Sequence, residues 1–134
     1  MILLVRHASA GSRHDWEGDD RERPLDERGR AQAEGLVGRL QQYPIDAILT
    51  SPYRRCVETV EPLARARGLE VELRPELGEE LQHTEGFALV RSLAGRDVVV
   101  CGHGGLEAVA ASPPKWKKGA VFVLGPALDV LASL

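Results

Sequence analysis

Residues 2–7 read ILLVRH, four aliphatic residues followed at once by an arginine and a histidine. A short aliphatic run without polar alternation is typical of a strand that is buried on both faces of a parallel sheet. Residues 46–51, DAILTS, and residues 97–105, DVVVCGHGG, have the same form, and the latter also contains a histidine at its end. The sequence therefore predicts buried strands that run directly into ionisable side chains.

Helical periodicity fills the stretches between these strands. Asp26 is the expected N-cap of the first helix, and Gly68 the expected end of the second. Helices are predicted over residues 24–43, 52–68 and 85–96, with a short one at 105–112, and further strands at 69–75 and 120–126, with a short strand or tail at 128–134. Strands that alternate with helices indicate βαβ units, so we expect a three-layer α/β/α sandwich with a mainly parallel central sheet.

The composition is that of an ordinary globular protein. The chain has 134 residues, 43% hydrophobic and 28% charged, so a single domain over residues 1–134 is expected. A net charge of −3 argues against a nucleic-acid partner. The sequence shows no signal peptide and no long apolar span, so no membrane partner is expected. Cys56 and Cys101 match no disulfide or metal pattern and are expected to be buried. We therefore expect a cytoplasmic protein, with its oligomeric state left open.

Three clusters of polar residues each follow a predicted strand. They are Arg6–His7, residues 51–55 and Gly102–His103. In open α/β sheets, ligands bind beyond the carboxyl ends of the strands, so the three clusters are expected to meet at one rim. Residues 8–25 lack periodicity and are rich in Gly, Ser, Asp and Arg, which predicts a long loop beside that rim.

The residue types in these clusters suit a phosphate dianion. Arg6 and Arg55 offer forks of hydrogen-bond donors that match phosphate oxygens, and the amides at the start of the helix after residue 51 would add donors. An imidazole beside such a site, from His7 or His103, can attack phosphorus and carry the phosphoryl group covalently. Residues 8–11, which follow His7, are all small.

Other phosphate and metal chemistries lack their motifs. A cysteine-based phosphatase would need an arginine where the chain has Pro62 and Glu107, six positions after each cysteine. There is no HExxH motif, no close His/Cys pairing and no P-loop sequence. We expect no metal, no cofactor and a metal-independent activity.

Four motifs resemble a known family. They are LVRHASA at 4–10, RPLDERGRAQA at 23–33, TSPYRRCVET at 50–59 and VVVCGHGG at 98–105. Together, and in this order, they resemble the histidine phosphatase (phosphoglycerate mutase-like) superfamily. The short chain looks most like its small SixA-type phosphohistidine phosphatases, and it also resembles the histidine phosphatase domain that follows a Nudix domain in some actinobacterial proteins.

The resemblance implies a phosphoglycerate mutase-like fold and a role for each matching residue. His7 would be the nucleophile that accepts the phosphoryl group. Arg6 and Arg55 would bind the phosphoryl oxygens, and His103 would donate a hydrogen bond to the same group. Arg54 is expected to be solvated, although it could exchange roles with Arg55.

The general acid is the open position in this scheme. Many family members carry an acidic residue in an L-x-E pattern, which Leu77 and Glu79 match here, with Glu80 next to it. We favour Glu79, with Glu80 or no acid as alternatives, because these carboxylates could equally form a solvated face. A phosphoramidate leaves as an easily protonated nitrogen base and needs an acid less than an alkyl phosphate ester does.

Two kinds of substrate and one inactive alternative remain. The preferred hypothesis is a phosphatase that acts on phosphohistidine in a protein. The second hypothesis is a phosphatase for small metabolites or nucleotides, and the third is a degenerate module that binds phosphate without turnover.

Two further histidines and a lysine-rich segment are expected on the surface. His14 and His83 are expected to be exposed, and residues 115–118, KWKK, to form a surface turn that could also attract an anionic substrate.

Overall fold

The computed structural model describes all of residues 1–134 and contains a single six-stranded sheet. The strands are β1 (Ile2–Arg6), β2 (Ala47–Thr50), β3 (Val71–Leu73), β4 (Val98–Gly102), β5 (Val121–Leu124) and β6 (Val130–Ser133), and the helices are α1 (Glu27–Arg39), α2 (Arg54–Arg67) and α3 (Phe87–Ser92). The strand order is β3-β2-β4-β1-β5-β6. The pairs β3–β2, β2–β4 and β4–β1 are parallel, whereas β5 and β6 add antiparallel strands at one side.

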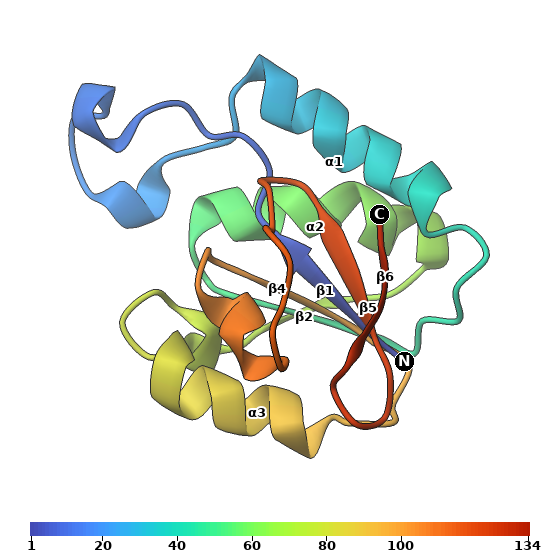
Figure 1. Cartoon of the computed structure of the whole chain (residues 1–134). Coiled ribbons are helices and arrows are strands. Elements are labelled where there is room, and N and C mark those ends of the chain that lie inside the picture. Colours follow the sequence, from blue (N-terminus) through green and yellow to red (C-terminus); the bar gives the residue numbers. More distant parts are fainter.

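Helices cover both faces of this sheet. In Figure 1, α1 and α2 lie on one side of the strands and α3 on the other. Alternate residues of β1 divide between the two layers: Leu3 and Val5 pack in the cluster beneath α1 and α2, and Ile2 and Leu4 in the cluster beneath α3. Helices on both faces fit the mainly aliphatic sequences of the central strands, and the predicted three-layer sandwich with a mainly parallel sheet is confirmed.

The element ends follow local chemistry. The Asp26 side chain accepts a hydrogen bond from the Gly29 amide and caps α1, as predicted. Gly68 ends α2 in the left-handed conformation with φ of 65°. The third helix is shorter than predicted at both ends: residues Gln82–Gly86 form a π-helical turn before α3 begins, and α3 ends at Ser92. The predicted short helix after β4 is a 3-10 turn, Leu106–Val109.

The loop over residues 8–25 holds two short 3-10 turns, Arg13–Asp15 and Asp20–Glu22. It leaves the end of β1 and returns to the start of α1, above the same sheet edge (Figure 1). None of the helices has both the length and the apolar character that crossing a bilayer requires.

One surface prediction is wrong in part. The lysines of residues 115–118 are exposed, but Trp116 is only 2% exposed and packs beside Phe122 in the layer under α3. The large apolar indole is buried because the strand β5 that follows brings it against that core.

Candidate functional site

Parallel strands bring the predicted clusters to one edge. Arg6 ends β1, Ser51 directly follows β2, and His103 directly follows β4, and these three strands are neighbours in the sheet. The rings of His7 and His103 lie with their centroids 5.5 Å apart and inclined at 64°. Both residues are almost fully buried: His7 is 5% exposed and His103 is 2% exposed. The expected meeting of the clusters is therefore what the fold produces.

A hydrogen bond to one ring nitrogen orients His7 and leaves the other ring nitrogen without a hydrogen. Its Nδ1 lies 2.8 Å from the Ala8 carbonyl oxygen, which can only accept, so Nδ1 carries the hydrogen. Nε2 then keeps its lone pair. Burial, reinforced by the nearby charges of His103, Arg55 and Arg6, lowers the pKa of His7 to about 3 despite that hydrogen bond. His7 is thus a neutral imidazole at physiological pH, the form that can act as a nucleophile.

Arg55 projects from the first turn of α2 and is fully buried. Its Nη1 donates to the carbonyl oxygen of Asp20 at 2.8 Å. Its Nη2 donates to the Asp20 carboxylate at 3.1 Å and to the Glu79 carboxylate at 2.9 Å. Arg54, by contrast, is exposed and pairs with Glu58 at 3.0 Å, so Arg55 is the arginine that the helix turns toward the site.

Arg6 is fixed from the other side of the cleft. Its Nη1 donates to the Trp116 carbonyl oxygen at 2.8 Å. A Cβ on Gly104 would lie only 3.0 Å from Arg6 Nη2, so the glycine after His103 lets the guanidinium pass beneath the backbone. The buried Trp116, which the sequence placed on the surface, thereby holds a candidate phosphate ligand.

A polar cleft of about 490 Å³ opens in front of His7. No hydrophobic residue lines it, and cations predominate: its walls are Arg6, His7, Gly11, Ser12, Arg13, Arg23, Glu79, Gly104 and Lys118. A cleft with this lining suits an anionic ligand.

The structure brings Glu79 to the site and leaves Glu80 outside. Glu79 Oε1 lies 2.7 Å from Arg13 Nη2, 2.9 Å from Arg55 Nη2 and 3.5 Å from His103 Nδ1. Glu80 is exposed and accepts a hydrogen bond from the Tyr53 hydroxyl at 2.6 Å. Of the two candidate acids, Glu79 therefore has the position from which a proton could reach a leaving group.

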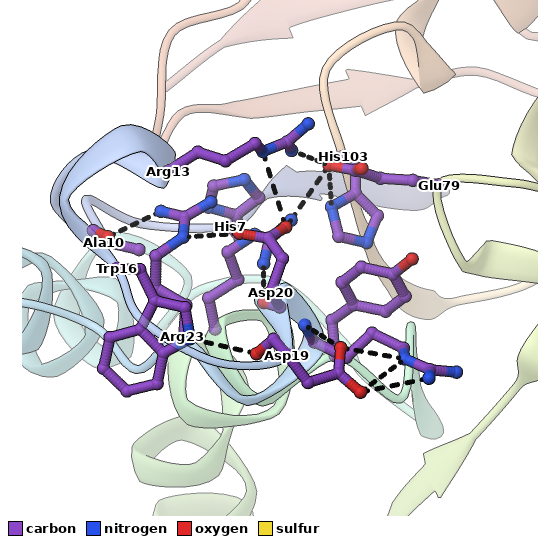
Figure 2. Close-up of polar contacts among 12 residues, drawn as sticks. His7, Ala10, Arg13, Trp16, Asp19, Asp20, Arg23, Glu79 and His103 are labelled. Carbon is purple, nitrogen blue, oxygen red and sulfur yellow. Dashed lines mark hydrogen bonds and ion pairs between the residues drawn. The ribbon is translucent and has the colours of Figure 1, made fainter.

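The sequence analysis did not single out Asp20 from the loop. Asp20 receives hydrogen bonds or ion pairs from Arg23 at 2.9 Å, Arg55 at 3.1 Å and Arg13 at 3.5 Å. Burial opposes its ionisation, but the hydrogen bond from Arg23 and the charges of Arg55, Arg23 and Arg13 outweigh it and lower the pKa of Asp20. Figure 2 shows Asp20 inside this network, with His7 and His103 beside it. The only sequence signal was the run of charges DDRER at 19–23.

The remaining candidates lie where they carry no site chemistry. His14 and His83 are exposed, as predicted. Cys56 and Cys101 are buried and unpaired, and burial raises the pKa of the Cys56 thiol well above its usual range, so it is not a nucleophile. No group of three or more His, Cys, Asp or Glu side chains is arranged to hold a metal ion.

Comparison with known families gives one match. The model of the histidine phosphatase superfamily (branch 1) matches residues 2–89. This span includes the candidate nucleophile and Arg55, and it covers most of the chain.

A curated relative and several solved structures are also similar. An 8-oxo-(d)GTP phosphatase of Mycolicibacterium smegmatis is 40% identical over 108 residues, which cover 77% of this chain but only 34% of that protein. The protein histidine phosphatase SixA complexed with tungstate superimposes with a TM-score of 0.81 at 21% identity, over 99% of this chain and 95% of the other. A protein from Agrobacterium tumefaciens assigned as phosphohistidine phosphatase SixA gives the same TM-score at 25% identity, over 99% and 96%.

Proposed function

The chain belongs to the histidine phosphatase superfamily (branch 1), and from that premise we propose that it hydrolyses a phosphorylated substrate through a covalent phosphohistidine on His7. Family membership and the phosphatase relatives support a hydrolase that acts on phosphoryl groups. The observation that carries the proposal is the hydrogen bond from His7 Nδ1 to the Ala8 carbonyl oxygen, because it leaves Nε2 unprotonated inside a cationic cleft.

The reaction follows from this arrangement in two steps. In the first, His7 Nε2 attacks phosphorus, the bond from phosphorus to the leaving group breaks, and the leaving group takes a proton from the Glu79 carboxyl or from solvent. In the second, water attacks the phosphorus of phospho-His7 and gives its proton back to the Glu79 carboxylate or to solvent, inorganic phosphate departs, and the neutral imidazole is restored. Arg6, Arg55 and His103 stabilise the charge on the transferring oxygens in both steps.

Glu79 is the proton donor for ester substrates in this proposal. Its carboxylate lies 3.5 Å from His103 Nδ1 and pairs with Arg55 at 2.9 Å. A phosphoryl group that binds Arg55 takes the place of Glu79 on Nη2. The freed carboxylate can then take up a proton and pass it to the leaving group. A phosphoramidate leaves as a nitrogen base and depends less on this proton.

We propose phosphohistidine on a protein as the substrate. The resemblance to the SixA structures extends over 99% of this chain, so the chain adds no large insertion to that framework. A compact framework leaves the cleft in front of His7 open, and a histidine side chain on a protein surface can reach such a cleft.

A nucleotide is the second candidate substrate. It is favoured by the 40% identity to the 8-oxo-(d)GTP phosphatase, although this chain spans only 34% of that protein. Lys118 and Arg13, both in the cleft lining, would suit the additional phosphates of such a ligand.

Trapping of the intermediate tests the reaction. The protein is incubated briefly with a radiolabelled generic phosphoryl donor, then denatured in base, where phosphohistidine survives, and in acid, where it does not. We expect base-stable, acid-labile label on the wild type and none on His7→Ala, with His14→Ala labelled like the wild type. Phosphate binding without any label would instead identify a degenerate binding module.

A substrate panel then separates the two substrate classes. Initial rates are compared on a phosphohistidine-bearing protein, on nucleoside di- and triphosphates and on sugar phosphates. A kcat/KM at least about tenfold higher on the phosphoprotein supports the first candidate. The reverse order would replace it with the nucleotide phosphatase.

A further inference from the structure

Ser51 directly follows β2 and contacts the second histidine of the site. Its Oγ lies 2.9 Å from His103 Nε2, and both residues are buried. The Tyr53 amide donates to the same Oγ at 3.2 Å. The serine hydroxyl is thus fixed between the backbone at the start of α2 and the imidazole.

The other nitrogen of His103 has a different environment. Nδ1 is buried, has no hydrogen-bond partner, and lies 3.5 Å from Glu79 Oε1. An unsatisfied buried polar atom costs free energy, so it is explained when a ligand supplies the partner. Nδ1 is therefore the atom from which His103 can donate to a bound phosphoryl oxygen.

We propose that Ser51 is a positioning residue that holds the hydrogen of neutral His103 on Nδ1. The Ser51 hydroxyl donates to Nε2, so the single N–H of the neutral ring is on Nδ1, where it faces the ligand. A hydroxyl can also accept from Nε2 when the imidazole is protonated, so the ring keeps one orientation in both charge states. This inference rests on the proposed phosphatase function and adds to it a residue that does not touch the substrate.

No other neighbouring group makes a comparable hydrogen bond to Nε2, although the Glu79 carboxylate 3.5 Å from Nδ1 also favours a hydrogen there. Cys56 Sγ lies 3.6 Å from His103 Nε2, and a thiol is a weak hydrogen-bond donor. The Tyr53 ring packs edge-on against His103 at a centroid distance of 4.6 Å and limits its tilt, but a ring contact does not choose the tautomer. Without Ser51, the imidazole is free to place its hydrogen on Nε2.

Kinetics of Ser51→Ala and Ser51→Thr provide the first test. We expect Ser51→Ala to lower kcat by about 10- to 100-fold with little change in KM, the range found when a partner that orients a metal-bound histidine is removed. Ser51→Thr keeps the hydroxyl and should recover most of the loss. Thr50→Val removes the neighbouring buried hydroxyl, which bonds to a carbonyl and not to His103, and should retain wild-type kcat.

Nitrogen-15 NMR of the histidine rings tests the tautomer without relying on turnover. The chain has only four histidines, and the spectrum of His103→Gln identifies the ring concerned. In the neutral ring, we expect the wild type to carry the hydrogen on Nδ1 and Ser51→Ala to shift it toward Nε2. A wild-type ring protonated on Nε2, or a tautomer unchanged in Ser51→Ala, would overturn the inference.

The outcomes separate this inference from the proposed function. If the wild type forms no phosphohistidine, the function fails, while the NMR result still decides the role of Ser51. If the wild type turns over normally and Ser51→Ala has wild-type kcat and an unchanged His103 tautomer, the function stands and the positioning role is wrong.

Discussion

The Asp20 carboxylate lies 3.1 Å from Nη2 of Arg55, although one residue is in the loop after β1 and the other in the first turn of α2. The Asp20 carbonyl oxygen also accepts from Nη1 of the same guanidinium at 2.8 Å. Arg55 therefore joins the loop to the site through a backbone contact, while its charge is shared with a carboxylate that a phosphate must compete with.

Replacing that carboxylate should strengthen phosphate binding. In Asp20→Asn, the backbone contact to Arg55 remains, and an incoming dianion then competes on this guanidinium with the Glu79 carboxylate alone. We expect the Kd for inorganic phosphate to fall about tenfold, measured by calorimetry. Asp19→Asn is the matched control, because Asp19 pairs with the exposed Arg21. Weaker phosphate binding in Asp20→Asn would mean that the carboxylate serves mainly to order the loop.

Glu79 should matter more for esters than for phosphoramidates. Glu79→Gln keeps the size of the side chain but cannot donate a carboxyl proton, so kcat on an alkyl phosphate should fall by about 100-fold or more. The loss on a phosphoramidate should be below about tenfold. Glu80→Gln, at the exposed neighbour, should alter neither rate. Equal losses on both substrates would remove Glu79 from the role of acid.

Buried His7 should make the fold sensitive to mild acid. Burial lowers its folded-state pKa to about 3, whereas an unfolded histidine titrates near 6.5. Between those values the unfolded chain binds the extra proton, so stability falls as pH falls, by at most about 1.4 kcal/mol per pH unit from this group. Urea unfolding from pH 6.5 to 4 should give a shallower decline for His7→Gln than for wild type. His14→Gln, at an exposed site, should retain the wild-type decline.

Gly29 connects the first turn of α1 to the site loop. A Cβ at Gly29 would overlap the carbonyl oxygen of Ser9, two residues after His7, and that oxygen also accepts from the Asp26 amide at 3.1 Å. Gly29→Ala should cost about 2 kcal/mol or more of unfolding free energy and lower activity. Gly35→Ala, in the same helix with open space around the site, should stabilise by about 0.5 to 1 kcal/mol. Equal effects of the two substitutions in a denaturant titration would contradict the close approach.

Chelation should leave the activity intact. In the proposed mechanism the charge on the transferring phosphoryl group is balanced by Arg6, Arg55 and His103, so no step requires a divalent cation. Rates are measured after dialysis against EDTA and again after addition of magnesium, manganese or zinc. A rate that falls on stripping and returns with one of these metals would show that a metal takes part.

The positions of the buried strands, and of the polar residues that follow them, were predictable because they depend on short stretches of sequence. The aliphatic run of β1 and the similar run of β4 identify buried parallel strands, and the side chains that follow such strands meet at one edge. His7 and His103 therefore come together as a consequence of topology, and the Asp26 cap follows from a hydrogen bond within one turn.

The contacts of the loop over residues 8–25 and the burial of Trp116 could be seen only in the tertiary structure. Asp20, Glu79 and Arg55 are far apart in sequence, and which carboxylate meets which guanidinium depends on how two aperiodic segments cross the same sheet edge. A run of charges such as residues 19–23 carries no periodicity that could indicate those partners. The spacing of hydrophobic residues and the capping of helices depend on residues close together in the chain. The sequence alone therefore determined the sheet and the pairing of His7 with His103. Ion pairs act through space, so only the tertiary structure decided what surrounds them.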